Sequence, residues 1–495
     1  MNDAVHDLEL LFRSRHAVVH LDTAEEGRAR GILHHVAHRL EIPFFVWTRS
    51  RGLQRAGMTG GVYGTAEPAA ALEHVAHARI DALYHFRGLS REALEGDLPT
   101  ALVRDCAESL AGRTGALVLT GPRLDLPEAL GAVVTHASLP CPSPDELREL
   151  LGQVVRDVSE RRHVQVDIAP ADLETLLTHL GGLTLIEAEK VLTRALVEDG
   201  VLNADDLRLV GDAKKSLIER DGLLEYTPVE ASLADIADLA GFKAWLAHRT
   251  AVVRDPARAR AAGLPFPRGV LLLGVPGCGK SLAAKAVAAE WRLPLLRLDP
   301  SGLYNKYIGE SERNFRRAMD TAERMAPVIL WIDELEKAFA SGGSEDGGVS
   351  QRVLGTFLSW LQERRGDVFV VATANDVQKL PPEFLRKGRF DEVFFVDLPD
   401  LETRAEILRI HLQSRDQDPG GFPLRELAEA AEGFSGSELE QAVVSVQYAA
   451  FAHGGTVEPD ALRAEISRTR PLSVTMAEPI ARLRSWAADR TVSAN

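Results

Sequence analysis

Short apolar runs alternate with longer helical stretches in the second half of the chain. Residues 270–273 are all apolar and predict a buried strand, and residues 328–332 predict a second one. Between them, residues 282–291 (LAAKAVAAEW) predict a helix, and a glycine-rich turn joins this helix to the first strand. Strands that alternate with helices in this way indicate an α/β domain with a parallel sheet.

The same pattern occurs in the first half, at a nearly constant offset of about 250 residues. Pro43 matches Pro294, for example. The paired segments, in order, are 16–47 with 268–298, 117–130 with 370–384, 181–192 with 432–443, and 200–208 with 455–463. The repeat predicts a tandem duplication. The alternative is two unrelated α/β domains that share the general alternation of strands and helices.

Composition narrows the class of protein. At 495 residues the chain is long enough for several domains, and its formal net charge of −15 argues against a nucleic-acid-coating surface. Cys106, Cys141 and Cys278 form neither a disulfide framework nor a zinc-binding spacing, which favours a reducing compartment. The acidic N-terminal segment does not resemble a signal peptide, and no apolar run approaches the ~20 residues that span a bilayer. We therefore expect a soluble cytoplasmic protein.

Residues 274–281 (GVPGCGKS) fit the P-loop pattern, and they stand between the first predicted strand and the helix. In this pattern backbone N–H groups surround the β-phosphate, and the helix dipole adds to the attraction. We expect Lys280 to bridge the β- and γ-phosphates and the Ser281 hydroxyl to bind Mg²⁺. A chance glycine-rich turn is the alternative. The predicted contacts with ATP are Gly274, Val275, Pro276, Gly277, Cys278, Gly279, Lys280, Ser281 and Leu282.

Asp333 and Glu334 follow the second predicted strand, at the edge where parallel sheets bind ligands. We expect Asp333 to hold Mg²⁺ and Glu334 to polarise the attacking water as a general base. More generally, such a pair is a helix N-cap with an acid in the first turn. Together with a P-loop, the pair indicates ATP hydrolysis.

The first copy differs from the second at these positions. Residues 22–29 (DTAEEGRA) lack the Gly-Lys-Ser of the P-loop and contain Glu25 and Glu26, which repel phosphate. Residues 82–88 (ALYHFRG) have no acidic pair. We therefore expect the first copy to be a non-hydrolysing module that packs against the active one or presents a surface to a partner.

Residues 230–490 resemble the AAA+ ATPases, specifically the branch of katanin, spastin and the membrane-fusion ATPases. Over the whole chain the likeness is to AAA ATPases first named as conserved chloroplast reading frames of algae and cyanobacteria, on segments such as 269–291, 352–363 and 385–400. The resemblance implies an α/β fold, a P-loop AAA+ sandwich with a helical lid, preceded by a degenerate AAA-like module with its own helical subdomain. With a linker expected around 222–242, the predicted parts are a degenerate α/β domain (1–145), a helical subdomain (146–222), an active large domain (223–400) and a lid with C-terminal helices (401–495).

The resemblance assigns further catalytic residues. Thr373 and Asn375 match the sensor 1 segment, where Asn375 orients water against the γ-phosphate. Arg386 and Arg389 match the two arginine fingers, which reach the ATP of a neighbouring subunit, and a guanidinium suits the developing phosphate charge. An ordinary solvated basic cluster is the alternative for these arginines.

The resemblance also assigns contacts with the nucleoside. Residues 235–239 match the segment that surrounds adenine, with Ile236 and Ala237 as contacts, although Ala237 and Asp238 replace the usual glycine pair. His411 and the Gly436–Ser437 pair match lid positions that close over the nucleoside.

Residues 303–314 resemble the segment with the first pore loop of the family, with Tyr307 as the aromatic residue that grips an extended polypeptide. Tyr307 and Ile308 as packed core residues are the alternative. Residues 340–350 are rich in glycine, serine and acids, as expected of a second pore loop.

These observations predict an ATP- and Mg²⁺-dependent, hexameric protein-remodelling ATPase that acts on a protein substrate or adaptor. A nucleotide-switched regulator or scaffold that threads nothing is the first alternative. A nucleic-acid-remodelling ATPase is the second, and the acidic balance disfavours it.

Overall fold

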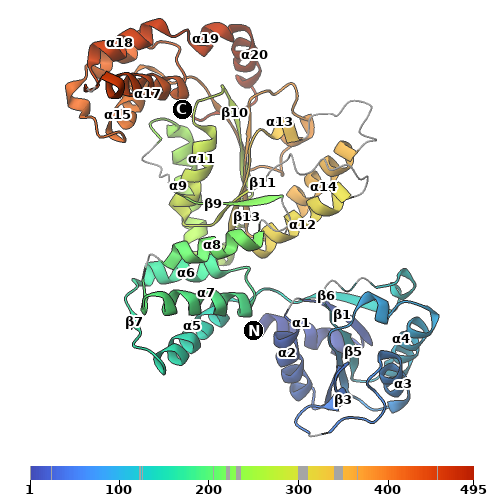
Figure 1. Cartoon of the computed structure of the whole chain (residues 1–495). Coiled ribbons are helices and arrows are strands. Elements are labelled where there is room, and N and C mark those ends of the chain that lie inside the picture. The colour runs from blue at the N-terminus through green and yellow to red at the C-terminus, as the bar shows by residue number, and fades with distance from the viewer. Residues whose placement is uncertain are drawn as a thin grey trace. The chain divides into compact units, whose positions relative to one another are not determined.

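The computed structural model describes residues 2–23, 25–58, 60–121, 124, 126–203, 206–218, 223–229, 236–298, 310–338, 349–364, 366–453 and 455–495. The chain forms two compact units, Met1–Val164 with Gly182–Val197, and Gln165–Gly181 with Glu198–Asn495. Each unit has one large sheet between layers of helices (Figure 1). The mixed α/β fold predicted from the sequence is therefore confirmed.

The sheet of the first unit has the strand order β3-β2-β4-β5-β1-β6, and β3 is its antiparallel edge strand. The strands are β1 (Val18–Asp22), β2 (Phe44–Thr48), β3 (Gly52–Arg55), β4 (Leu83–Phe86), β5 (Ala116–Leu119) and β6 (Val134–Ser138). The helices of this unit are α1 (Asn2–Arg13), α2 (Glu26–Arg39), α3 (Pro68–Ala78), α4 (Asp97–Leu110), α5 (Pro144–Ser159) and α7 (Leu185–Glu198). Helices α1 and α2 cover one face of the sheet, and α3 and α4 cover the other.

The sheet of the second unit has the order β15-β14-β10-β13-β12-β11-β9. Its strands are β9 (Leu224–Thr227), β10 (Gly269–Gly274), β11 (Leu295–Leu298), β12 (Val328–Ile332), β13 (Val368–Ala374), β14 (Glu392–Val396) and β15 (Val492–Ser493). Helices α9 (Ala240–Arg254) and α11 (Lys280–Trp291) cover one face, and α12 (Glu310–Arg324) and α14 (Val349–Glu363) cover the other. Strands β10, β12 and β13 are buried along their whole length, which explains why they are apolar runs rather than alternating patterns.

The five parallel strands of the two sheets have the same topology. The order β2-β4-β5-β1-β6 corresponds to β11-β12-β13-β10-β14. The antiparallel edge strands differ, because β3 follows β2 along the chain whereas β9 precedes β10. The first strand of each copy lies between the last two parallel strands, and the helices follow in the same layers. This agreement is what a tandem duplication predicts.

Part of the expected linker is not a linker. Strand β9 pairs antiparallel with β11 at the sheet edge. Leu224 and Tyr226 point into the core, whereas Glu225 between them is exposed. A strand of this length gives too short an alternation to stand out in the sequence.

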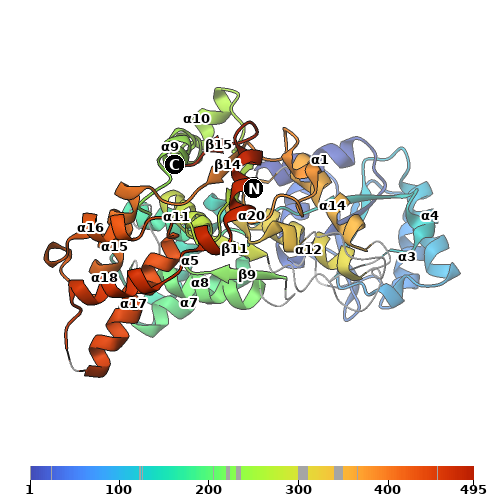
Figure 2. The same cartoon turned by 90° about the horizontal axis from the view of Figure 1, so that it is seen from above.

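The second unit also contains a helical lid, which forms after β14 and has its own core. It consists of α15 (Leu401–Gln413), α16 (Leu424–Ala430), α17 (Gly436–His453) and α18 (Pro459–Arg468), which lie together in Figure 2. After the lid, α19 (Leu472–Thr475) and α20 (Ala477–Ala487) lead the chain back to the large sheet, where β15 pairs with β14. Arg484 of α20 forms hydrogen bonds of 2.8–2.9 Å with the carboxylate of Asp397, just after β14.

The remaining elements are small. The second unit includes the two-stranded sheet of β7 (Gln165–Val166) and β8 (Val201–Leu202), with α6 (Pro170–Leu180), α8 (Asp206–Ile218), α10 (Pro256–Ala261) and α13 (Leu335–Ala338). The helices expected at 146–222 thus divide between the two units, and the predicted domain bounds stay a prediction. In the described part of the chain, no helix has both the length and the apolarity needed to cross a bilayer.

Candidate active site

The predicted P-loop connects β10 to α11 at the carboxyl edge of the sheet. Strand β13 lies between β10 and β12, so the residues that follow these three strands meet at one edge. Gly274 ends β10 so close to β14 that a Cβ atom there would lie 2.0 Å from the carbonyl oxygen of Val396. Gly279 precedes α11 with φ +84°, a conformation that L side chains rarely adopt. Glycine is therefore required at both positions.

Lys280 is buried at the start of α11. Its Nζ donates hydrogen bonds to the carbonyl oxygens of Gly274 (2.9 Å) and Val275 (2.7 Å). Burial lowers the pKa of Lys280 to about 8, against the opposing influence of nearby groups that include Glu336, Asp333 and Glu334. The ammonium group of Lys280 is thus hydrogen-bonded to the P-loop, where the predicted phosphate site lies.

Asp333 connects the three strand ends. Its Oδ1 atom accepts hydrogen bonds from the hydroxyl groups of Ser281 (3.1 Å) and Thr373 (2.6 Å). A carboxylate and a hydroxyl at this separation are the kind of oxygen ligands that Mg²⁺ takes beside a phosphate. The donor set therefore fits the predicted magnesium site.

Glu334 lies between the same strands. Its backbone N–H donates to the Thr373 hydroxyl (3.0 Å), and its φ of +51° is unusual for a residue other than glycine. Asn375 Nδ2 donates to one oxygen of the Glu334 carboxylate (3.3 Å), and Lys337 Nζ pairs with the other (2.6 Å). The predicted base and the predicted sensor are thus in direct contact.

Two members of this network were missed in the sequence. Lys337 is one of them. Glu336 is the other: it is 3 % exposed, and its Oε1 accepts a hydrogen bond from the backbone N–H of Asn375 (2.9 Å). Burial raises the pKa of Glu336. Glu336 and Lys337 lie two and three residues after Glu334, in the short helix α13, so the four charged residues within 333–337 were the available signal.

The lid contacts the P-loop through the start of α17. The carbonyl oxygen of Gly277 accepts hydrogen bonds from the backbone N–H (3.0 Å) and the hydroxyl group (3.1 Å) of Ser437. Gly436 approaches the same carbonyl so closely that an added Cβ would lie 3.2 Å from it. The predicted Gly436–Ser437 pair therefore lies against the P-loop.

His411 belongs to a charged group within the lid. Its Nδ1 lies 3.3 Å from Nη1 of Arg415 and 3.8 Å from Oε1 of Glu440. Burial, rather than its charged neighbours, is the main cause of the lowered pKa of His411. A neutral ring suits the predicted contact with a nucleoside, which stays a prediction.

The predicted adenine segment lies beside the P-loop. Ile236 is buried in the same core as α11, and Cys278 packs against that core. Lys243 Nζ donates a hydrogen bond to the carbonyl oxygen of Ile236. Asp238 accepts hydrogen bonds from Leu239 N–H (2.7 Å) and Asn495 Nδ2 (2.8 Å).

Arg386 and Arg389 lie at the other edge of the sheet. They precede β14, whose first residues pair with the start of β10. Arg268, which precedes β10, donates a side-chain hydrogen bond to the carbonyl oxygen of Gly388. The P-loop follows the far end of β10, and a strand of six residues is about 17–20 Å long. The structure thus separates both arginines from the P-loop of their own chain.

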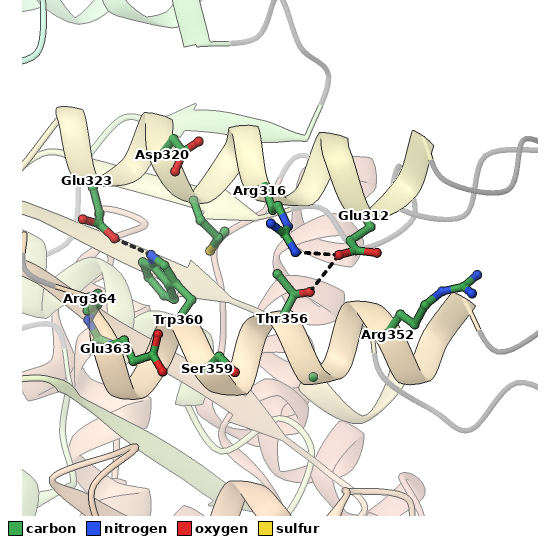
Figure 3. Close-up of a pocket in the computed structure, with 12 residues that line it drawn as sticks. Glu312, Arg316, Asp320, Glu323, Arg352, Thr356, Ser359, Trp360, Glu363 and Arg364 are labelled. Carbon is green, nitrogen blue, oxygen red and sulfur yellow. Dashed lines mark hydrogen bonds and ion pairs between the residues drawn. The ribbon is translucent and has the colours of Figure 1, made fainter. Parts of the chain in front are cut away.

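Tyr307 and residues 340–348 lie outside the described residues. The helices that follow these segments, α12 and α14, lie side by side with their first turns at the same end (Figure 3). Glu312 near the start of α12 accepts a hydrogen bond of 3.5 Å from Thr356 of α14, and at the far end Trp360 donates to Glu323 (2.6 Å). A polar groove of about 850 Å³ lies between the two helices. Its lining does not include the P-loop, so it is separate from the phosphate site.

In the first unit, the charges at the corresponding edge of the sheet are reversed. Glu26 is the first residue of α2, as Lys280 is of α11, and Arg87 follows β4, as Asp333 follows β12. Glu26 Oε1 accepts hydrogen bonds from Gly88 N–H (2.7 Å) and Thr120 Oγ1 (3.0 Å), and its Oε2 lies 3.9 Å from Arg87 Nε. A carboxylate thus occupies the place where the second unit has a cation.

A second cluster of charges fills the same region of the first unit. Arg28 is almost fully buried and pairs with Glu25 (3.2 Å) and Glu146 (2.9 Å). The other oxygen of Glu25 accepts a hydrogen bond of 2.6 Å from Leu185 N–H, at the start of α7. The donors around this edge are thus bonded to carboxylates of the chain itself.

Comparisons with known proteins agree with this architecture. A profile of the ATPase family associated with various cellular activities (AAA) matches residues 270–398. Profiles of the N-terminal and second domains of SpoVK-like AAA ATPases match residues 4–139 and 145–221.

Full-length relatives are similar over nearly the whole chain. The AAA domain-containing protein ycf46 of Trieres chinensis is 34% identical over 486 residues, which cover 97% of this chain and 96% of that protein. Its counterpart in Pyropia yezoensis is 32% identical over 487 residues, with 98% and 97% covered. The proteasome-activating nucleotidase of Pyrococcus furiosus is 38% identical over 227 residues, which cover 44% of this chain and 57% of that protein.

A P-loop, a strand followed by Asp-Glu and a helical lid define an AAA-type ATPase, and the chain is an ATP hydrolase. It belongs to the family of the ycf46 AAA proteins, with SpoVK-like domains before its AAA domain. The expected placement in the katanin and spastin branch stays a prediction.

We expect Glu334→Gln to keep ATP binding and to lower turnover by about 10²-fold or more, because an amide does not accept the proton of the attacking water. Steady-state hydrolysis and calorimetric ATP binding measure the two effects separately. Turnover close to wild type would remove Glu334 from the role of base.

We expect the affinity for MgATP to fall as the pH rises through about 8, because the pKa of Lys280 in the free protein is about 8. A bound triphosphate retains the ammonium form, so the affinity should be level below this pH and fall roughly ten-fold per pH unit above it. Calorimetry across this range measures the profile. Lys280→Arg is the control, because its guanidinium stays charged and any affinity it keeps should not change with pH. A level wild-type profile would contradict the assignment.

Proposed function

We propose that the protein is a ring-forming, Mg²⁺-dependent ATPase, most simply a hexamer, that remodels a protein substrate. The observation that carries the proposal is the position of Arg386 and Arg389, at the sheet edge opposite the P-loop. A finger at that edge acts on the ATP of another subunit, so a complete catalytic site requires assembly. Proteasome-activating nucleotidases, which the second half resembles, support an activity on proteins.

Within that site, each group has a proposed role. Lys280 binds the β- and γ-phosphates, and Ser281 and Asp333 hold Mg²⁺, which neutralises phosphate charge when bound. Glu334 accepts the proton of the attacking water, while Asn375 fixes the orientation of the Glu334 carboxylate by their hydrogen bond. Ile236, Ala237, His411, Gly436 and Ser437 surround the nucleoside.

The pairing of α12 and α14 supports a threading mechanism. The two segments expected to grip a polypeptide directly precede these helices, and the helices start at the same end of the pair. A joint shift of the two helices would therefore move the ends of both segments together. The three free cysteines fit a reducing compartment such as the cytoplasm.

We further propose that the first unit does not bind nucleotide. Phosphate would have to displace Glu26 from Thr120 and Gly88, and it would meet the negative charges of Glu25 and Glu26. Breaking a buried pair such as that of Arg28 and Glu146 costs about 3–5 kcal/mol. Such a unit is suited to a structural or partner-binding role.

Arg386→Ala alone is expected to lower turnover by about 10³-fold, because the finger neutralises charge in the transition state. Mixing it with Glu334→Gln should restore part of the activity, since some interfaces then join an intact finger to an intact pocket. Lys387→Ala, at an exposed neighbouring position, is the matched control and should resemble wild type. If the two inactive variants co-assemble by light scattering yet stay inactive, the arginine does not act in trans.

Lys280→Ala in the full chain should abolish micromolar ATP binding altogether, because the first unit offers no second site. Calorimetry measures the residual binding. Lys285→Ala, on the same helix α11, should bind like wild type. A remaining site of micromolar affinity in Lys280→Ala would contradict the proposal that the first unit does not bind nucleotide.

Tyr307→Ala separates remodelling from a nucleotide-switched scaffold. In a threading ATPase, this variant should keep basal hydrolysis but lose its stimulation by an unfolded probe such as labelled casein. Tyr307→Phe should keep the stimulation, because it retains the aromatic ring. If casein stimulates the wild type and Tyr307→Ala equally, Tyr307 has no role in threading.

A further inference from the structure

Residues 491–495 form an additional edge of the ATPase sheet. Strand β15 pairs in parallel with β14, with Val492 opposite Phe394 and Ser493 opposite Phe395. The backbone N–H of Ala494 extends this pairing by a 2.9 Å hydrogen bond to the carbonyl oxygen of Phe395. The last strand of the chain is thus attached to the strand that borders the P-loop.

The same residues hold the start of α9. Phe242 N–H donates a 3.1 Å hydrogen bond to the carbonyl oxygen of Ala494. Gly241 passes so close that an added Cβ would lie 2.7 Å from the carbonyl oxygen of Ser493. Ala494 itself has no exposed surface and is part of the core that contains Phe242 and Ile236. This contact is therefore packed rather than incidental.

A side-chain hydrogen bond extends the contact to the segment before α9. Asn495 Nδ2 donates to Oδ2 of Asp238 (2.8 Å), while Oδ1 of Asp238 accepts from Leu239 N–H (2.7 Å). Leu239 has φ +67°, which a leucine rarely adopts, so its conformation needs support from neighbouring groups. Asp238 supplies that support, and Asn495 fixes the orientation of Asp238.

The supported segment forms one side of the nucleotide site. Ile236 and Leu239 share a core with Ala283 and Ala284 of α11, against which Cys278 and Leu282 also pack. A triphosphate at the start of α11 has the lid on one side, where Ser437 meets Gly277. Because the loop residue Cys278 packs against the core that contains Ile236 and Leu239, the proposed nucleoside contact places the base on this side.

We propose that residues 491–495 position the nucleoside-binding segment 236–242, with the hydrogen bond between Asn495 and Asp238 as the specific link. Asn495 is a positioning residue in this role, because it acts through Asp238 and Leu239. The proposal rests on the proposed contact of Ile236 and Ala237 with the nucleoside. It also explains why Asp238 occupies a position where the resembling ATPases have glycine: its carboxylate is needed to hold residues 491–495.

The test compares ATP with inorganic tripolyphosphate, which has the phosphates but no nucleoside. Asn495→Asp places a second carboxylate against Asp238 and should weaken ATP binding by about three- to ten-fold. Its affinity for tripolyphosphate should match that of wild type, and KM for ATP should rise with little change in kcat. The double variant Asp238→Asn with Asn495→Asp reverses the polarity of the hydrogen bond and should restore ATP affinity.

Two further variants keep the result interpretable. Asp489→Asn alters an exposed side chain just before residues 491–495 and should behave as wild type. Asn495→Ala removes the hydrogen bond without adding charge, and it replaces Asn495→Asp if the latter has a lower thermal midpoint than wild type without nucleotide.

Three outcomes would count against the proposal. Unchanged ATP affinity in Asn495→Asp and Asn495→Ala would overturn it. An equal loss of ATP and tripolyphosphate affinity would also overturn it, since the effect would then lie in the P-loop. If the wild type itself binds both compounds equally, the nucleoside contact of Ile236 and Ala237 fails first.

Discussion

The hydrogen bonds from Ser281 and Thr373 to one oxygen of Asp333 are the interaction on which the catalytic edge depends. They connect the ends of three strands that are adjacent in the sheet but far apart in the sequence. Thr373 also accepts from the backbone of Glu334, so the same hydroxyl fixes both acidic residues. Because the three strands are parallel and buried, their carboxyl ends have no freedom to separate. Lys280 is drawn into this negative environment even though burial lowers its pKa.

The two units show how one topology supports opposite electrostatics. In the second unit, a cation at the start of α11 faces carboxylates after β12, an arrangement whose charges suit both phosphate and a metal ion. In the first unit, Glu26 at the start of α2 faces Arg87 after β4, and Thr120 donates to Glu26 rather than to an acid after the strand. The first unit thus supplies both members of the ion pair, so Glu26 and Arg87 have partners without a ligand. The two units thus differ in the sign of the charge at two corresponding positions, Lys280 and Asp333 in the second unit and Glu26 and Arg87 in the first.

Further contacts hold the edges of the ATPase sheet and the segments that follow its strands. At the amino end of β10, Arg268 and Asp391 fasten the loop that carries Arg386 and Arg389, since the Arg268 backbone donates to Asp391 Oδ2 over 2.7 Å. At the outer edge, β15 connects β14 to the start of α9. The lid reaches the P-loop through Ser437, and Arg484 of α20 bonds to Asp397 after β14. The large sheet is therefore fixed at its amino end and at its outer edge, and the lid contacts it at the P-loop.

Local features of this protein follow from its amino-acid sequence alone. The apolar runs 270–273 and 328–332 predicted β10 and β12, because buried parallel strands need no polar face. The glycines of the P-loop were readable because close backbone approach and positive φ exclude side chains. The repeat predicted a tandem duplication, and the five parallel strands of the two sheets follow the same order.

Which residues distant in the sequence come into contact depends on the fold. Strand β9 lies in the expected linker, and its alternation is too short to detect without its partner β11. Glu336 and Lys337 were not predicted as site residues, but in the structure they contact Asn375 and Glu334. Asn495 and Asp238 are in contact although they are 257 residues apart in the sequence, and no local pattern indicates this contact. Local sequence patterns indicate which secondary structure a segment forms. Contacts between segments depend on strand order, which short-range spacing in the sequence does not encode.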